Sequence, residues 1–153
     1  MENISKHISY KEATRSNTAL RRGIENIPDV EELENMKLIA EKVFEPLRKW
    51  VGGPIKINSF YRSPELNVAI GGSKKSQHCH GQAMDIDDTF GHRSNASMFK
   101  HIRYNMDYDQ MIWEFGDDKN PAWVHISYVS EEENIQRGLR AVKKNGKTHY
   151  EVM

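Results

Sequence analysis

The 153-residue sequence contains a single cysteine, Cys79, so no disulfide can form within the chain. No apolar run approaches the ~20 residues that a membrane-spanning helix needs, and we expect no membrane insertion. Neither sign of charge is in excess, since 22 Lys and Arg balance 22 Asp and Glu, which argues against nucleic acid as a partner. The sequence also lacks repeats and Pro/Gly/Ser-rich linkers, so we expect a single domain over residues 1–153 and a monomer.

Residues 1–7 lack the basic and then apolar segments of a signal peptide. The lone cysteine fits a reducing compartment. Together these two absences predict synthesis in the cytoplasm without a signal peptide.

Capping residues and apolar periodicity predict helices mainly in the first two thirds of the chain. Capping-box spacing from Ser9 to Glu12 predicts a short helix there. Apolar residues at three- and four-residue steps predict a long helix over about 30–50, which Pro46 should kink or break. Ser63 and Ser94 are placed to cap two further helices.

Alternating and apolar segments predict strands between and after these helices, at 54–60, 83–87, 111–115 and 123–129. Residues 73–80 are expected to form a polar loop, and Glu131–Glu133 a solvated helix start. Asn145-Gly146 predicts a C-terminal hairpin over about 138–152, outside a core of about 9–129. The expected fold class is α+β, with a small, largely antiparallel sheet and helices packed on one side.

The segment 76–85 carries the most chemistry. A turn at Gly81 could bring His78 and Asp85 to one point. Asp85 lies between the apolar Met84 and Ile86, and burying a lone carboxylate is costly, so Asp85 needs a partner. A metal ion or a charged network would supply one.

His125 is a polar residue within another apolar strand. Two imidazoles and one carboxylate are a usual ligand set for catalytic zinc, with a fourth position left for water. Two other interpretations remain open: His125 as a hydrogen-bonded core residue, and Asp85 as a structural carboxylate paired with Arg62.

These residues also resemble a known family. Residues 76–85 match the signature S-x-H-x-x-G-x-A-x-D of the zinc D-Ala-D-Ala carboxypeptidases, and residues 123–125 match its second motif, W-x-H. The segment 59–73 is similar to the one that precedes the first motif. The family includes vancomycin-resistance D-Ala-D-Ala dipeptidases and phage L-alanyl-D-glutamate endopeptidases, and it shares its fold with the Hedgehog signalling domain. The resemblance is closest to small phage and prophage members.

The resemblance implies one Zn²⁺ per chain, bound by His78, Asp85 and His125. It also implies hydrolysis of amide bonds in bacterial peptidoglycan stem peptides. Arg62 is similar to the family arginine that stabilises negative charge on the carbonyl oxygen.

The expected catalytic base departs from the family pattern. Many relatives carry an acidic residue three positions before the last histidine, where this chain has Ala122. Glu114 is our choice instead, because it is the only charged residue in an apolar strand and should be partly buried with a tuned pKa. Asp117 and Asp118 are rivals within an apparent turn.

Four further residues are candidates for substrate binding or for supporting the ligands: Ser76, His80, Asp87 and Trp123. Cys79 is set aside as a ligand, because a closed thiolate site suits hydrolysis poorly. We expect an endolysin-type endopeptidase that acts on the wall after release or as a virion component. The alternatives are a non-catalytic zinc-containing virion or binding protein of the same fold, and a D-Ala-D-Ala carboxypeptidase or dipeptidase.

Overall fold

A computed structural model of the protein describes residues 2–153. The helical elements, in chain order, are α1 (Tyr10–Thr14), α2 (Asn17–Arg22), α3 (Val30–Ile39), η1 (Ala40–Phe44), α4 (Glu45–Val51), α5 (Pro64–Ala69), η2 (Gln77–His80) and α6 (Asn95–Asn105). The strands are β1 (Lys56–Ser59), β2 (Ala83–Asp87), β3 (Gln110–Glu114), β4 (Trp123–Ser127), β5 (Arg137–Lys144) and β6 (Lys147–Val152). The α+β class is confirmed.

The strands form one mixed six-stranded sheet in the order β1-β2-β4-β3-β5-β6. Four neighbouring pairs are antiparallel, and β3 and β5 pair in parallel. The sequence predicts a largely antiparallel sheet, and the parallel β3–β5 pair is its one exception.

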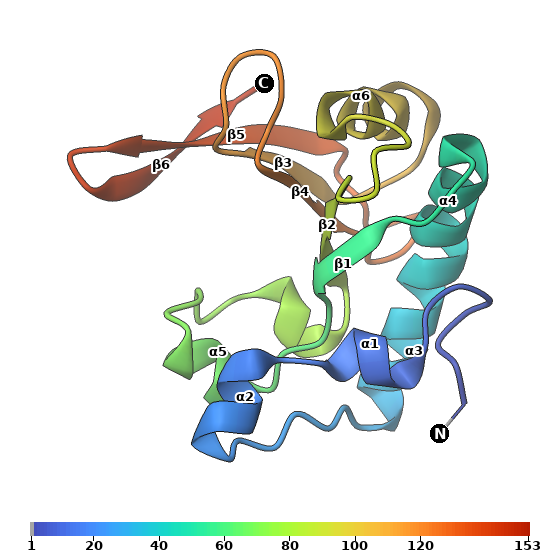
Figure 1. Ribbon diagram of the computed structural model, residues 1–153, viewed down its shortest axis with the longest axis vertical. Helices are drawn as coiled ribbons and strands as arrows, with labels where there is room; N and C mark the ends of the chain where they lie inside the picture. The colour runs from blue at the N-terminus through green and yellow to red at the C-terminus, as the bar shows by residue number, and fades with distance from the viewer. Residues whose placement is uncertain (1) are drawn as a thin grey trace.

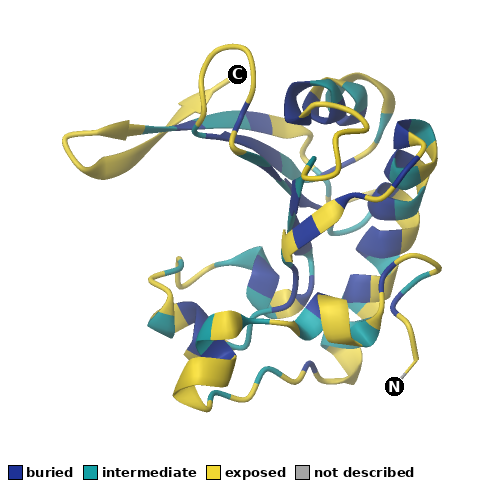
Figure 2. Ribbon diagram, in the orientation of Figure 1, coloured by how far each residue is buried: buried dark blue, intermediate teal, exposed yellow. Residues whose placement is uncertain are grey.

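The sheet curves, and the chain is arranged differently on its two sides (Figure 1). The long helix α3-η1-α4 and helix α6 cover one face, and buried residues lie along this contact (Figure 2). Phe44, Met98 and Phe99 are in that core, together with Met84 and Ile86 of β2. Helices α1, α2 and α5 lie below the sheet and leave the other face of β3–β6 open.

The predicted helix over 30–50 exists, but Pro46 does not break it. Asp29 caps its start with a complete capping box. The turn before the proline is a π-helix, in which the Glu45 N–H donates to the Ala40 carbonyl. A wider turn keeps the chain helical although Pro46 has no N–H to donate.

Two smaller expectations were wrong. Residues 77–80 are not loop but a 3-10 turn, η2, whose start is capped by the Ser76 hydroxyl accepting from the His78 N–H. Residues 131–133 form an exposed turn and not a helix start. Within residues 2–153, no helix combines the length and apolarity needed to cross a bilayer.

Candidate metal centre and cleft

His78 and Asp85 are brought together by the tight turn between η2 and β2. The turn depends on Gly81, which has a φ of +72° and ends η2 in the left-handed conformation. A Cβ at this position would also lie 2.5 Å from the backbone oxygen of Glu32 in α3. Gly81 therefore satisfies two demands, a left-handed backbone and close packing against the long helix.

His125 reaches the same point from the neighbouring strand. Asp85 of β2 lies directly opposite His125 of β4 in the antiparallel register, so both side chains project from the open face. His125 Nδ1 lies 3.0 Å from Asp85 Oδ1, and His78 Nε2 lies 3.3 Å from Asp85 Oδ2. One ligand atom from each of the three residues lies within 4.8 Å of the others.

The hydrogen bonds of His78 fit a metal ligand. Its ring is 1% exposed, and Nδ1 lies 2.7 Å from the Phe60 carbonyl, which can only accept, so Nδ1 carries the proton. Nε2 then has a bare lone pair that faces the Asp85 carboxylate, and this buried atom has no hydrogen-bond partner. A lone pair facing a carboxylate oxygen favours a cation between them, so the residues present fit Zn²⁺.

The ionisation states agree with this arrangement. Burial lowers the pKa of His78 below its usual value, against the opposing effect of Asp85, and so keeps the imidazole neutral. Burial alone would raise the pKa of Asp85, but the surrounding contacts, among them the hydrogen bond with His125, outweigh it and hold that pKa well below its usual range. A neutral imidazole and an ionised carboxylate are the forms that bind metal.

Arg62 lies beside this cluster. Its Nη2 is 3.8 Å from Asp85 Oδ2, farther than either histidine nitrogen, and its backbone N–H donates to the His78 carbonyl. Burial lowers the pKa of the guanidinium while Asp85 opposes that shift, and an arginine remains a cation under such conditions. Its Nε is buried without a hydrogen-bond partner. Both the Asp85–Arg62 contact and the His–Asp contacts considered from the sequence are thus present.

Glu114 lies on the other side of the cluster, at the end of β3. Ile112 is opposite His125 in the register, so Glu114, two residues on, projects from the same face. The preceding Trp113 packs instead against Phe99 of α6, with ring centroids 5.4 Å apart. Glu114 is 8% exposed, and burial, only partly offset by His125 and Arg62, raises its pKa from 4.5 to about 7. Ala122, the position at which the resemblance led us to look for an acid, is adjacent, because its N–H donates to the Glu114 carbonyl.

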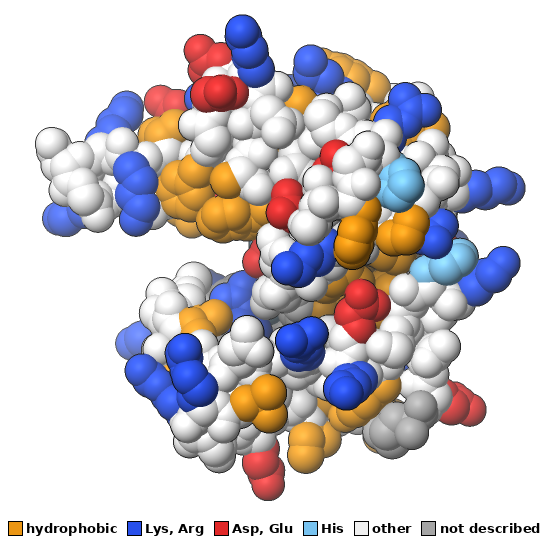
Figure 3. Space-filling model, viewed as in Figure 1, with side chains coloured by type: hydrophobic (Ala, Val, Ile, Leu, Met, Phe, Trp, Pro, Cys, Tyr) orange, Lys and Arg blue, Asp and Glu red, His pale blue; other side chains and the backbone are white. Residues whose placement is uncertain are grey.

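These groups lie in a cleft of about 760 Å³ between the open face of the sheet and the segment 70–78. The molecule is hollowed on this side, with hydrophobic side chains gathered under the β5–β6 hairpin (Figure 3). The lining includes the His78, Asp85, His125, Arg62 and Glu114 side chains. A substrate bound in this cleft can therefore bring one of its bonds close to all five side chains.

The four supporting candidates divide evenly. Ser76 and Trp123 line the cleft. His80 does not: its side chain is exposed, and only its backbone carbonyl is used, as acceptor for Asn35. Asp87 is not part of the lining either, and its carboxylate accepts from Asn95 and Thr89.

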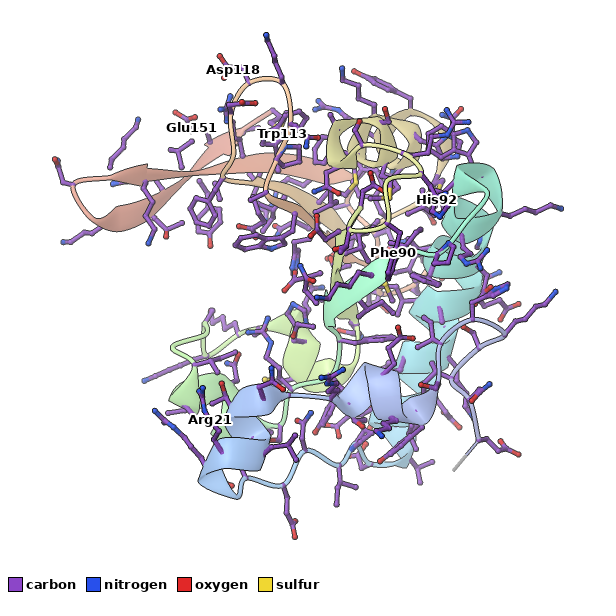
Figure 4. All side chains as sticks on the ribbon, in the orientation of Figure 1. Arg21, Phe90, His92, Trp113, Asp118 and Glu151 are labelled. Atoms are coloured by element: carbon purple, nitrogen blue, oxygen red, sulfur yellow. The ribbon has the colours of Figure 1, made fainter. Side chains whose placement is uncertain are left out.

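The rival bases lie elsewhere. Asp117 accepts hydrogen bonds from the Lys119 and Asn120 backbone N–H groups in an exposed turn. Asp118 forms an ion pair with Arg140 and points away from the cleft (Figure 4). Cys79 is a partly exposed free thiol outside the cleft lining.

Sequence reasoning gave no role to two residues near the site. Asn67 of α5 is buried, accepts from Arg62 at 3.4 Å and donates to the Ser73 carbonyl, so it links the arginine to the cleft loop. A Cβ at Gly72 would lie 2.1 Å from Asn67 Oδ1, and this close approach explains the glycine.

Tyr150 of β6 also lines the cleft. Burial and the negative charges of Glu114 and Asp85 raise its pKa, so the phenol stays neutral.

Comparison with known proteins agrees with the geometry. A protein-family model described as Peptidase M15 matches residues 6–127, a range that contains the three metal-site residues, Arg62 and Glu114. A search of curated proteins gives no match. The chain therefore belongs to the Peptidase M15 family, the zinc D-Ala-D-Ala carboxypeptidase-like peptidases.

Proposed function

We propose that the protein is a zinc peptidase that hydrolyses amide bonds in peptidoglycan stem peptides, as an endolysin-type endopeptidase. One observation carries the proposal: three suitable ligand atoms lie within 4.8 Å of one another on a cleft floor, with a carboxyl of raised pKa and a guanidinium beside them. That combination is typical of a hydrolytic site.

His78, Asp85 and His125 would hold the metal. Zinc bound there supplies a Lewis acid and lowers the pKa of water toward neutrality. The chain's own residues supply the remaining chemistry.

Glu114 acts as the general base. Its carboxyl sits in an apolar strand end with a pKa raised to about 7, so near neutral pH it can accept a proton from water and later return it to the leaving amine. An ordinary surface glutamate would be a weaker base because its pKa is lower.

Arg62 supports the developing oxyanion. Its guanidinium is mostly buried beside the cluster and held by Asn67, so its charge is fixed in place before the reaction begins. A preorganised cation in a poorly solvated cleft stabilises transition-state charge more than a mobile surface one.

The size of the cleft favours an endopeptidase. At about 760 Å³ it falls in the range of sites that enclose drug-sized ligands, so it has room for a peptide longer than a dipeptide. A dipeptidase that acts on free D-Ala-D-Ala needs much less room.

The proposal is tested by digestion of purified peptidoglycan with zinc-loaded protein, followed by mass spectrometry of the products. We expect new amine ends and fragments cut within the stem peptide, and no such products from Glu114→Gln. The non-catalytic alternative requires that no new amine ends form at any zinc loading. Cleavage of free D-Ala-D-Ala but not of the wall would instead identify a dipeptidase.

A further inference from the structure

The β5–β6 hairpin lies outside the residues that the family model matches, yet it forms one wall of the cleft. The match ends at residue 127, and β5 and β6 cover Arg137–Lys144 and Lys147–Val152. Five of its residues line the cleft: Arg137, Leu139, Thr148, Tyr150 and Val152. The hairpin is therefore part of the site although it lies beyond the matched region.

Two rows of opposed side chains run across the sheet from the metal centre to the hairpin. In one row, Glu114 lies opposite Ala141, and Ala141 lies opposite Tyr150. In the other, His125 is followed by Ile112, Leu139 and Val152 across three strand pairings. Opposed residues project from the same face of a sheet, so Tyr150 and Val152 share the face of Glu114 and His125.

The small residue between Glu114 and Tyr150 explains how the tyrosine approaches the site. Ala141 is completely buried although it lies on the cleft face of the sheet. A larger side chain there would separate the tyrosine from Glu114. Glu151, the residue between Tyr150 and Val152 in β6, points to the opposite side of the hairpin, as Figure 4 shows, so its carboxylate does not lie between these two side chains.

The part of this wall formed by Leu139, Tyr150 and Val152 is apolar, with Arg137 and Thr148 beside it, and its two β6 residues are exposed. Tyr150 is 57% exposed and Val152 is 80% exposed, although both line a cleft. The wall continues into Phe115 and Trp123, whose ring centroids lie 5.5 Å apart. Exposed aromatic and aliphatic side chains that line a concave site beside reactive groups are typical of ligand contacts.

We propose that the β5–β6 hairpin is the specificity wall of the cleft, on which Tyr150 and Val152 contact an uncharged stretch of the substrate peptide next to the scissile bond. The inference rests on the proposed function for the identity of the substrate. The occupant is a peptide with small apolar side chains, such as alanyl residues, whose methyl groups pack on the rings. The neutral Tyr150 hydroxyl donates to a peptide carbonyl.

The test compares Tyr150→Ala and Tyr150→Phe with Tyr104→Ala. Tyr104 is a matched control, because it is a 75% exposed tyrosine on α6, outside the cleft lining. Kinetics are measured on zinc-loaded proteins with isolated stem peptides, one ending in D-Ala-D-Ala and one lacking the last D-Ala. Binding of the same peptides to zinc-loaded Glu114→Gln, with and without Tyr150→Ala, is measured by calorimetry.

We expect Tyr150→Ala to raise KM roughly ten-fold with little change in kcat, and to weaken peptide binding by a similar factor. Tyr150→Phe should lose only part of this, and Tyr104→Ala none. Zinc content and the unfolding temperature should match those of the wild type. Unchanged binding in the Tyr150→Ala background, or a loss confined to kcat, would overturn the inference. A wild type that binds these peptides through Tyr150 but cleaves none of them would contradict the proposed function and not the hairpin's role.

Discussion

Glu114 makes the metal-free protein's stability depend on pH in a defined direction. Its pKa is about 7 in the folded protein, whereas the unfolded chain releases this proton near 4.5. The folded state therefore binds more protons between these two values, and the free energy of unfolding falls as pH rises through the window. Above pH 7 the full cost of the ionised, buried carboxylate is present.

The size of the effect follows from the same two values. Moving one pKa from 4.5 to about 7 corresponds to ~3 kcal/mol for a carboxyl fully shielded from water. Because Glu114 faces a solvated cleft, we expect roughly 2 kcal/mol. Glu114→Gln removes the charge and keeps the shape, so the variant should be more stable than the wild type by this amount at pH 8 and equal to it near pH 4.5.

The assay is urea unfolding of both proteins in excess chelator at several pH values between 4.5 and 8. The difference between variant and wild type isolates Glu114 from the other titrating groups. Glu132→Gln is the control, since Glu132 is exposed in the turn after β4. Parallel curves for Glu114→Gln and the wild type across this range would refute the burial argument, and with it the reason for choosing this residue as base.

Three further outcomes follow from the site geometry. Arg62→Lys should keep its zinc but lose roughly 100-fold in kcat, because a lysine cannot reproduce the planar guanidinium that Asn67 holds in place. Steady-state kinetics measure the loss, and a loss below about three-fold would contradict the oxyanion role. Gly81→Ala should lower the free energy of unfolding by about 2 kcal/mol more than Gly23→Ala, because both positions have positive φ but only a Cβ at position 81 would meet backbone atoms. Chemical denaturation measures both losses. Equal losses would show that helix α3 moves aside at no cost in free energy. His78→Ala should bind no zinc in metal analysis, while His80→Ala, two residues away and exposed, should bind as the wild type does.

The His78, Asp85 and His125 cluster could be predicted from the sequence because local patterns determine where these side chains point. Alternation within β2 places Asp85 opposite Met84 and Ile86, and Gly81 marks the turn that returns the chain toward His78. The pairing of β4 with β2 is then sufficient to place His125 beside Asp85. Glu114 was identified by burial, since a lone charge in an apolar strand implies an unusual environment.

The hairpin's contribution to the cleft was not accessible in the same way. Asn145-Gly146 correctly predicted the turn, but nothing local shows that β5 would pair in parallel with β3. That non-local pairing alone brings Tyr150 to the row of Glu114. The helix over 30–50 was predicted, but the π-turn before Pro46 was not, because such a turn is set by packing and not by residue propensity.

We propose that His78, Asp85 and His125 hold the zinc, with Glu114 and Arg62 beside it. An anomalous-difference map from crystals of the zinc-loaded protein, collected at the zinc absorption edge, tests this most directly. We expect one strong peak per chain, in contact with His78 Nε2, a ring nitrogen of His125 and an Asp85 oxygen. A peak at Cys79 or His80, or no peak in fully loaded crystals, would contradict it.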